Sequence, residues 1–501
     1  MSSQRHHRRP HWPPHWHWHP HWHLHLHRPH LPPHLSARTV LRRSGLARLA
    51  LIVALLAAAA MVFPRVVLPV AAGLLALLYL ASTIDRNYLL LKGIHMNAMV
   101  RVSAEEALSI PDEELPHYTV LLPVYDEPAI VANLVNGVCK LDYPRDKLDV
   151  LLLVEEDDTA TQLALADMEL ESVHVVIVPH SMPKTKPKAC NHGMSLPILT
   201  DGLMTIYDAE DIPDPLQLRR AAAAFRRLPD DIGCIQARLG YFNESQNLLT
   251  RWFSLEYDQW FGVMLPAVQE SGCVVPLGGT SNHMPTRVWR DVGGWDEFNV
   301  TEDADLGVRL ARHGYRTVIL DSTTLEEANS DVVNWIRQRS RWYKGYLQTM
   351  LVHLRHPLRL RREIGTKAVL RLINLTGGVP LAGATNLVFA LTLLVWLVGR
   401  PYQIEALFPP ITYYICLTLF LIGAPVSVFV GLVVTQSLGK PWLWWAVLLS
   451  PLYWALQSIA AVKALYQLLF RPFFWEKTVH GLAASPDPTP SPGGRDELVD
   501  A

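Results

Sequence analysis

Residues 148–158 read LDVLLLVEEDD, a continuous apolar run that ends in four acidic residues. An apolar run of this length without polar alternation is typical of a parallel strand that is buried on both faces. Runs of the same kind occur at residues 118–123, 173–178 and 203–207. Helical patterns separate them, at residues 128–139 and 215–225. This alternation predicts an α/β domain with a doubly wound sheet.

Acidic residues follow two of these predicted strands, where such a sheet binds its ligands. One group is residues 155–158, and the other is Asp208-Ala-Glu210-Asp211. Carboxylates two residues apart can reach one divalent cation, and Mg²⁺ and Mn²⁺ prefer carboxylate and phosphate oxygens. We therefore expect Asp208 and Glu210 to be metal ligands, with Asp211 as a spare candidate. The alternative is a helix cap or a solvated loop.

Two further strings combine charged and aromatic residues. Thr301-Glu302-Asp303 is acidic, and Gln338-Arg-Ser-Arg341-Trp342 lies on a basic helical stretch. Arginine makes bidentate contacts with phosphate, and tryptophan offers a flat face for stacking. An interfacial membrane helix is the alternative for the second string, with arginines toward the headgroups.

A resemblance to the family 2 glycosyltransferases rests on four motifs in order: Leu122-Pro-Val-Tyr125-Asp-Glu127, Asp208-x-Glu210, Thr301-Glu302-Asp303 and Gln338-x-x-Arg341-Trp342. The chain resembles in particular the membrane-embedded processive synthases of cellulose, chitin, hyaluronan and poly-N-acetylglucosamine. The resemblance implies a GT-A-like fold, a UDP-sugar donor, Mg²⁺ or Mn²⁺, and a growing polysaccharide as acceptor. It implies an inverting, processive β-glycosyltransferase that exports its product.

The resemblance also implies roles at the donor. Tyr125 and Glu127 would lie at the uridine, and Glu155 and Glu156 would hold the base and ribose, although the family usually has two aspartates there. In the string Lys186-Pro-Lys188-Ala-Cys-Asn191, Lys188 would approach the donor diphosphate.

At the acceptor, the resemblance makes Asp303 the general base, with Glu302 in the same catalytic motif. Gln338 and Trp342 would frame the acceptor sugar, and Arg341 would stabilise the departing UDP. The small-residue string that ends in His283 resembles the acceptor strand of these synthases. For His283 a structural role and a substrate contact remain equally open.

Membrane segments flank this domain in the sequence. Residues 49–63 and 66–81 are apolar and predict a tight transmembrane hairpin, and an arginine cluster precedes it. By the positive-inside rule, we expect a multi-pass protein of the plasma (inner) membrane with its catalytic domain in the cytoplasm. The lipid bilayer is thus a partner. Residues 379–398, 411–434 and 442–470 predict further crossings. The expected total is either five or six membrane crossings.

The expected organisation follows from these patterns. It comprises a disordered His/Trp/Pro-rich tail (1–36), a transmembrane hairpin (46–84), a glycosyltransferase domain (100–350), interface helices (351–375), C-terminal membrane helices (376–471), a gating segment (472–481) and a disordered tail (482–501). The first tail is either a metal-binding tract or a dispensable basic tail. The gating segment has an interfacial anchor as its alternative.

Composition narrows the class of protein. The 501 residues carry a net charge of -1, which argues against nucleic acid as a partner because phosphate binding needs a basic excess. The five cysteines form no CxxC pair, which argues against a disulfide framework or a zinc site. Two other functions remain: transfer of one sugar to a lipid or short glycan, and metal handling by a His-rich membrane protein. Accessory export subunits are compatible with the polymer hypothesis.

Overall fold

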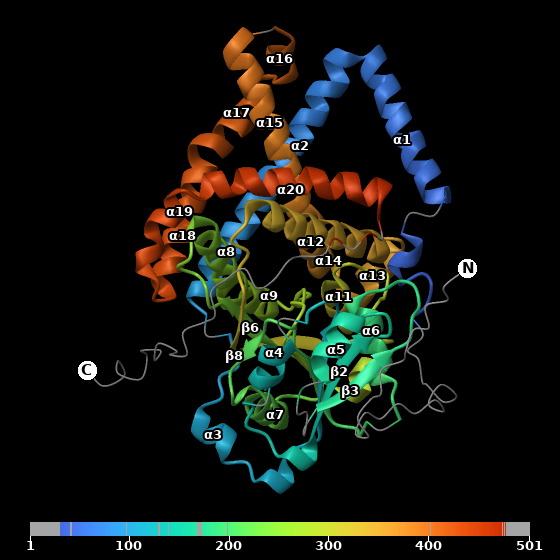
Figure 1. Ribbon diagram of the computed structural model, residues 1–501. Helices are drawn as coiled ribbons and strands as arrows, with labels where there is room; N and C mark the ends of the chain where they lie inside the picture. The colour runs from blue at the N-terminus through green and yellow to red at the C-terminus, as the bar shows by residue number, and fades with distance from the viewer. Residues whose placement is uncertain are drawn as a thin grey trace, which may run out of the picture.

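The computed structural model describes residues 31–40, 43–96, 98–128, 131–138, 140–166, 168, 173–197, 199–400, 402–472, 474 and 476. Figure 1 shows a sheet domain at one end and a group of long helices at the other. The expected tail over residues 1–30, the tail over 482–501, and most of the expected gating segment lie outside the described residues.

An eight-stranded sheet forms the centre of the sheet domain, in the order β3-β2-β1-β4-β7-β6-β8-β5. Strands β1 to β4 are parallel, and β7 runs antiparallel to both β4 and β6. The sheet is therefore mixed rather than wholly parallel. The strands are β1 (Tyr118–Val124), β2 (Leu148–Glu155), β3 (Val173–Val178), β4 (Leu203–Ile206), β5 (Ile212–Pro213), β6 (Ile232–Tyr241), β7 (Asn282–Pro285) and β8 (Arg316–Glu326).

Helices cover both faces of the sheet, which explains why β1 and β2 are apolar throughout. Val120 and Leu122 on β1 pack in one core cluster with residues of α4, α5 and α7, whereas Leu121 packs in another cluster with α6, α10 and α11. The bounds are α4 (Val131–Val138), α5 (Thr159–Ala166), α6 (Lys186–Met194), α7 (Gln217–Arg227), α10 (Thr286–Asp291) and α11 (Glu302–Arg312). The α/β prediction is confirmed, and α3 (Ala104–Leu108) lies at the lower end in Figure 1.

A second set of helices connects this domain with the long apolar ones. It contains α8 (Leu248–Gln259), the π-helix η5 (Trp260–Met264), α9 (Leu265–Glu270), α12 (Val332–His353), α13 (Pro357–Ile364), α14 (Thr366–Ile373) and the π-helix η6 (Asn374–Gly378). Asn247 caps α8 by accepting a hydrogen bond from Thr250 N, and Asp331 caps α12 in the same way at Asn334 N.

Within the described residues, three helical stretches are long and apolar enough to cross a membrane: Pro64–Ile94, Thr366–Gly399 and Pro410–Ser437. They contain α2 (Pro64–Ile94), α15 (Val379–Gly399), α17 (Pro410–Thr418) and α18 (Ala424–Ser437). α1 (Arg43–Val62) precedes α2 and contributes a shorter apolar stretch, Ala50–Val62. α16 (Tyr402–Leu407) links α15 to α17 at the top of Figure 1.

The expected last crossing, residues 442–470, is a broken stretch. α19 (Trp444–Leu448) and α20 (Ser450–Phe470) belong to a pair of helical segments that is bent by 59° at Leu449. Figure 1 shows α20 lying across the long axes of α2 and α15, directly over α12. The break at Ser450-Pro451 follows from proline, which is tolerated only in the first turn of a helix.

The chain after α20 returns to α12. Gln348 Nε2 on α12 donates to Pro472 O at 2.8 Å, and Lys344 Nζ donates to Phe474 O at 2.5 Å. The described part of the expected gating segment therefore lies against the helix that carries Gln338, Arg341 and Trp342.

Candidate active site

One pocket of about 430 Å³ opens where the carboxyl ends of β1, β2, β4 and β8 face the start of α11 and the side of α12. It brings together most of the residues that the sequence singles out. They are Tyr125, Glu127, Glu155, Asp208, Glu210, Glu302, Asp303, Gln338, Arg341 and Trp342. Glu156 and Lys188 are not among the residues that line it.

Lys188 is a structural residue, contrary to the expectation that it approaches the donor. Its side chain is buried, and its ammonium group donates to Glu155 Oε2 at 2.7 Å and to Pro179 O at 2.9 Å. Glu156 points away as well, because it is exposed and accepts a hydrogen bond from His180 N at 3.0 Å.

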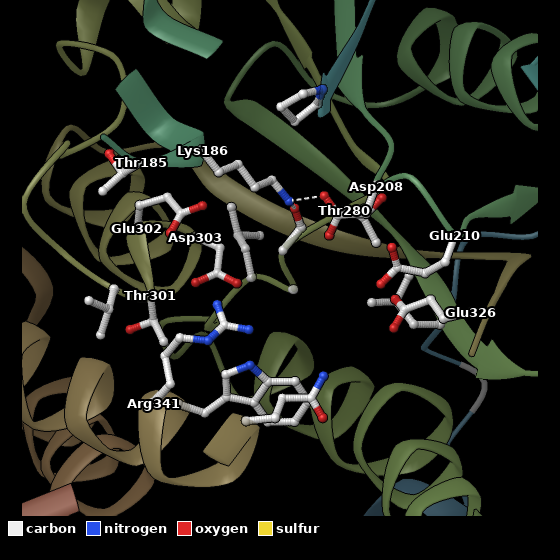
Figure 2. A pocket seen from close by; sticks show the side chains of 18 of the residues that line it. Thr185, Lys186, Asp208, Glu210, Thr280, Thr301, Glu302, Asp303, Glu326 and Arg341 are labelled. Carbon is white, nitrogen blue, oxygen red and sulfur yellow. Dashed lines mark hydrogen bonds and ion pairs between the residues drawn. The ribbon is translucent and has the colours of Figure 1, made fainter. Parts of the chain in front are cut away.

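Lys186, and not Lys188, lines the pocket. Its Nζ donates to the Asp208 carboxylate and, at 2.7 Å, to Gly279 O, as Figure 2 shows for the first of these contacts. Burial acts to lower the pKa of Lys186, but the carboxylates of Asp208 and Glu302 outweigh it and raise the pKa. Lys186 is therefore a fixed positive charge inside the pocket.

Gly279 lies where three of these side chains meet. A Cβ added there would lie 3.4 Å from Asp303 Oδ2, 3.7 Å from Lys186 Nζ and 4.0 Å from Asp208 Oδ2. A side chain at this position would therefore fill the space between the candidate base and the candidate metal ligand.

The two acids at the start of α11, Glu302 and Asp303, both have raised pKa values. Burial raises the pKa of Glu302, and the neighbouring Asp303 carboxylate raises it further. Burial also raises the pKa of Asp303, while the Ala304 N–H, Lys186 and Arg341 act in the opposite direction. Ala304 N donates to Asp303 Oδ1 at 2.7 Å and thereby orients the carboxylate. A carboxylate with a raised pKa is a stronger base, which suits proton abstraction.

Arg339 anchors α12 so that Arg341 and Trp342 reach the pocket. Its guanidinium group donates twice to the Glu256 carboxylate, at 2.8 and 2.6 Å, and lies 4.7 Å from the centre of the Trp342 ring. Trp342 also stacks with Tyr257 at 6.2 Å between ring centres. The indole is thus held in place by α8, and Figure 2 shows Arg341 pointing toward Glu302 and Asp303.

Several carboxylates gather after β4 and at the end of β8. Figure 2 shows Glu210 beside Glu326, and burial together with the carboxylates of Asp211, Glu210 and Asp208 raises the pKa of Glu326 far above its ordinary value. Among the described residues, no three His, Cys, Asp or Glu side chains are arranged to hold a metal by themselves. Asp208 and Glu210 do fit a cation that completes its shell with phosphate oxygens, and the excess of negative charge favours one.

Asp211 is not available as the spare ligand. It is buried, accepts a hydrogen bond from Asp208 N at 2.7 Å and accepts another from the Thr280 hydroxyl group. It therefore shapes the turn after β4. His283 is structural too, because its Nδ1 contacts the Tyr118 hydroxyl group at 2.6 Å and burial lowers its pKa to about 3.

Sequence reasoning missed several pocket residues: Lys184, Lys186, Glu256, Tyr257 and Glu326. Lys186 stands two positions before the lysine that we chose, and periodicity along α6 was the signal that separates Lys186 from Lys188. Glu256 and Glu326 lie far from every motif in the sequence, and no local pattern marks them.

The family model for glycosyl transferase family group 2 matches residues 203–473, more than half of the chain. The protein belongs to this family. It is a sugar-transferring enzyme with a mixed α/β, GT-A-like fold. The matched region begins at β4 and runs through α12 to the end of α20, so it contains Asp208, Asp303 and Arg341.

Relatives of this glycosyltransferase are named for different sugar-transfer activities. It is 28% identical over 240 residues to a probable glucomannan 4-beta-mannosyltransferase 7 of Oryza sativa, covering 46% of this chain and 41% of that protein. It is 24% identical over 279 residues to a beta-monoglucosyldiacylglycerol synthase of Trichormus variabilis, covering 55% and 58%. The chain thus spans about two-fifths to three-fifths of the length of these two curated relatives.

A solved structure shares the fold. It is the mannosyltransferase PcManGT from Pyrobaculum calidifontis in complex with GDP-Man and Mn²⁺, with a TM-score of 0.50 and 16% identity. The match covers 80% of this chain and 99% of that one. At this identity, the similarity shows the fold alone.

Proposed function

We propose that this glycosyltransferase is an inverting β-glycosyltransferase of the membrane, which takes a sugar from a UDP-sugar and extends a polysaccharide acceptor. The observation that carries the proposal is the meeting of Asp208, Lys186 and Asp303 around Gly279, within one pocket that α12 closes. A metal-ligand candidate, a fixed cation and a strong base are what displacement of a nucleoside diphosphate requires.

Asp303 acts as the general base. The acceptor hydroxyl group loses its proton to the Asp303 carboxylate while its oxygen bonds to the anomeric carbon. The bond from that carbon to the diphosphate oxygen breaks, and the electron pair leaves with UDP. A single displacement inverts the anomeric centre, so an α-linked donor gives a β-linked product.

Positive groups stabilise the leaving diphosphate. Lys186 and Arg341 face the same space as Asp303, and both favour the negative charge that develops on the departing oxygen. Asp208 and Glu210 would hold Mg²⁺ or Mn²⁺, which supplies Lewis-acid stabilisation of the diphosphate. Tyr125, Glu127 and Glu155 lie on the side of the pocket where the nucleoside would bind.

The acceptor side faces the long helices. Gln338 and Trp342 line this part of the pocket, and Leu375 of η6 and Val379 of α15 close it. An acceptor therefore reaches Asp303 from the direction of the apolar helices. This direction of approach supports export of the product past α15. The cytoplasmic orientation of the catalytic domain is proposed from the arginine cluster that precedes residues 49–63.

A second candidate is transfer of one sugar to a lipid. The apolar side chains of Leu375 and Val379 fit an acceptor that is embedded in the bilayer, and one relative is named a beta-monoglucosyldiacylglycerol synthase.

Product sizing separates the two candidates. The full-length protein in proteoliposomes is incubated with labelled UDP-glucose, UDP-N-acetylglucosamine or GDP-mannose and Mn²⁺, with Asp303→Asn as the blank. A ladder of long products supports the polymerase. A single-sugar adduct on extracted lipid overturns it in favour of the lipid transferase, and the absence of turnover with every donor contradicts both.

A further inference from the structure

The segment that precedes α1 is packed into the catalytic domain. Ser36 and Ala37 are buried, with 7% and 0% of their surface exposed, although we expected residues 31–36 to belong to a disordered tail. Ser36 Oγ donates to Asp296 Oδ1 at 2.9 Å, and Ala37 N donates to Asp296 Oδ2 at 2.5 Å. The contact of Ser36 with Asp296 joins positions that are 260 residues apart in the sequence.

Arg355 and Arg38 fix the same segment from two sides. The Arg355 guanidinium group donates to three backbone oxygens, those of Pro33 at 3.3 Å, His34 at 2.8 Å and Ser36 at 3.2 Å. The Arg38 guanidinium group lies 5.2 Å from the centre of the Phe298 ring. Residues 33–38 are therefore held along their length and not at one point.

Asp296 belongs to the loop that delivers the catalytic acids. This loop, residues 292–301, connects α10 with α11 and ends at Thr301, directly before Glu302 and Asp303. Residues 185–191 and α12 both anchor it, and Thr185 Oγ1 donates to Glu297 O at 3.0 Å while Val300 N donates to Gln348 Oε1 at 3.3 Å. Asn191 of α6 bonds the backbone of Trp295 at 2.9 and 3.0 Å, and on α12 Thr349 bonds Asn299 at 2.8 Å.

The N-terminal segment is a further anchor of this loop, and its contact is made through Asp296. The Asp296 carboxylate accepts hydrogen bonds from Ser36 and Ala37, and it accepts a third from Phe298 N at 3.2 Å, within the loop itself. Burial and the nearby Asp305 raise the pKa of Asp296 to about 6, and the donors at residues 36 and 37 counteract them. Without those donors, a buried carboxyl group would be left without partners outside its own loop.

We propose that residues 33–38 position the catalytic acids, through the contact of Ser36 and Ala37 with Asp296. This proposal rests on the proposed function, because it assigns Asp303 as the base. Asp296 is a positioning residue, since it touches neither the pocket nor its acids. The contact also ties the start of α1, five residues after Arg38, to the geometry of the pocket.

Point variants of the full-length protein test the proposal. Ser36→Ala removes one hydrogen bond to Asp296, and Asp296→Ala removes all three. Thr39→Val is the matched control, because the Thr39 hydroxyl group bonds only Pro33 O and Ser36 O within the segment. The readouts are kcat and donor KM for UDP release, and hydrogen exchange of the amides of residues 297–304.

We expect Ser36→Ala and Asp296→Ala to lower kcat about tenfold, to leave the donor KM within about twofold, and to speed exchange at residues 297–304 by a similar factor. The double variant should be no slower than Asp296→Ala, because that variant already removes the hydrogen bond that Ser36→Ala removes. Thr39→Val should match the wild type in both readouts.

Wild-type exchange and kcat in Ser36→Ala would overturn the proposal, even if Asp296→Ala is inactive through misfolding. A failure of the proposed function looks different. In that case no donor is turned over by the wild type, and the exchange of residues 297–304 in Ser36→Ala still decides whether the segment holds the loop.

Discussion

Lys186 donates a hydrogen bond to the Asp208 carboxylate, and the two side chains meet beside Gly279 within reach of Asp303. The Lys186 ammonium group is thus fixed between Asp208, the candidate metal ligand, and Asp303, the candidate base. When a donor binds, its diphosphate is the group best suited to share this cation with Asp208.

Lys186→Met should slow sugar transfer while preserving the fold, whereas Lys188→Met should mainly lower the free energy of unfolding. Lys186 faces the pocket, so its loss removes charge stabilisation, which we expect to lower kcat about a hundredfold. Lys188 neutralises the buried Glu155, and breaking a buried ion pair costs about 3–5 kcal/mol. UDP release and thermal unfolding of both variants provide the comparison. Equal loss of stability in the two would contradict the assignment.

Asp303→Asn should lower kcat by a factor of about 10² to 10⁴, the usual contribution of a general base. Binding of UDP with Mn²⁺ should remain, because Asp303 serves the acceptor. Asp230→Asn, an exposed aspartate in the turn between α7 and β6, is the control for the loss of one carboxylate. Turnover by Asp303→Asn within tenfold of the wild type would show that the base lies elsewhere.

The acid limb of the pH profile should lie well above the ordinary aspartate pKa. Asp303 works only when it is deprotonated, and burial raises its pKa, so kcat falls as the pH drops through that raised value. Arg341 acts to lower the pKa of Asp303, so Arg341→Gln should move the limb to higher pH. The exposed Arg287→Gln should leave it in place. A shift toward lower pH in Arg341→Gln would refute the electrostatic argument.

Removal of divalent metal by EDTA should stop turnover, and Mn²⁺ or Mg²⁺ should restore it. Glu210→Gln should weaken the binding of Mn²⁺, measured by electron paramagnetic resonance with UDP present, more than Glu210→Asp does, because the amide loses the charge and the aspartate keeps it. Glu113→Gln, exposed and remote from the pocket, is the control. Full activity in EDTA would show that Lys186 and Arg341 stabilise the leaving diphosphate without a metal ion.

Lys344→Met should loosen the chain after α20. The buried Lys344 holds Phe474 O, and burial lowers its pKa to about 8, which shows how strongly the site penalises its charge. We expect faster proteolytic cleavage near residue 474 in the variant. Lys367→Met, on an exposed position of α14, should leave cleavage unchanged. Unaltered cleavage in Lys344→Met would mean that the hydrogen bond from Gln348 to Pro472 O holds the segment without Lys344.

The sequence by itself predicted four of the eight strands, β1 to β4, and the candidate catalytic groups. The apolar runs of β1 to β4 and the motifs at Asp208, Asp303 and Arg341 are local patterns, and helices on both faces require those runs to be apolar throughout. Local patterns do not settle which of two neighbours faces the site. Lys186 and Lys188 are two positions apart on a helix, about 200° around its axis, so only one reaches the pocket.

Tertiary structure alone decided the contacts between distant segments. Neighbouring side chains at a strand end point to opposite sides, which separates Glu155 in the pocket from Glu156 outside it. Hydropathy predicted a crossing over residues 442–470, but the direction of α20 depends on its packing against α12. The contact of Ser36 with Asp296 joins residues 260 positions apart, and such a contact forms only when the whole domain has folded around it.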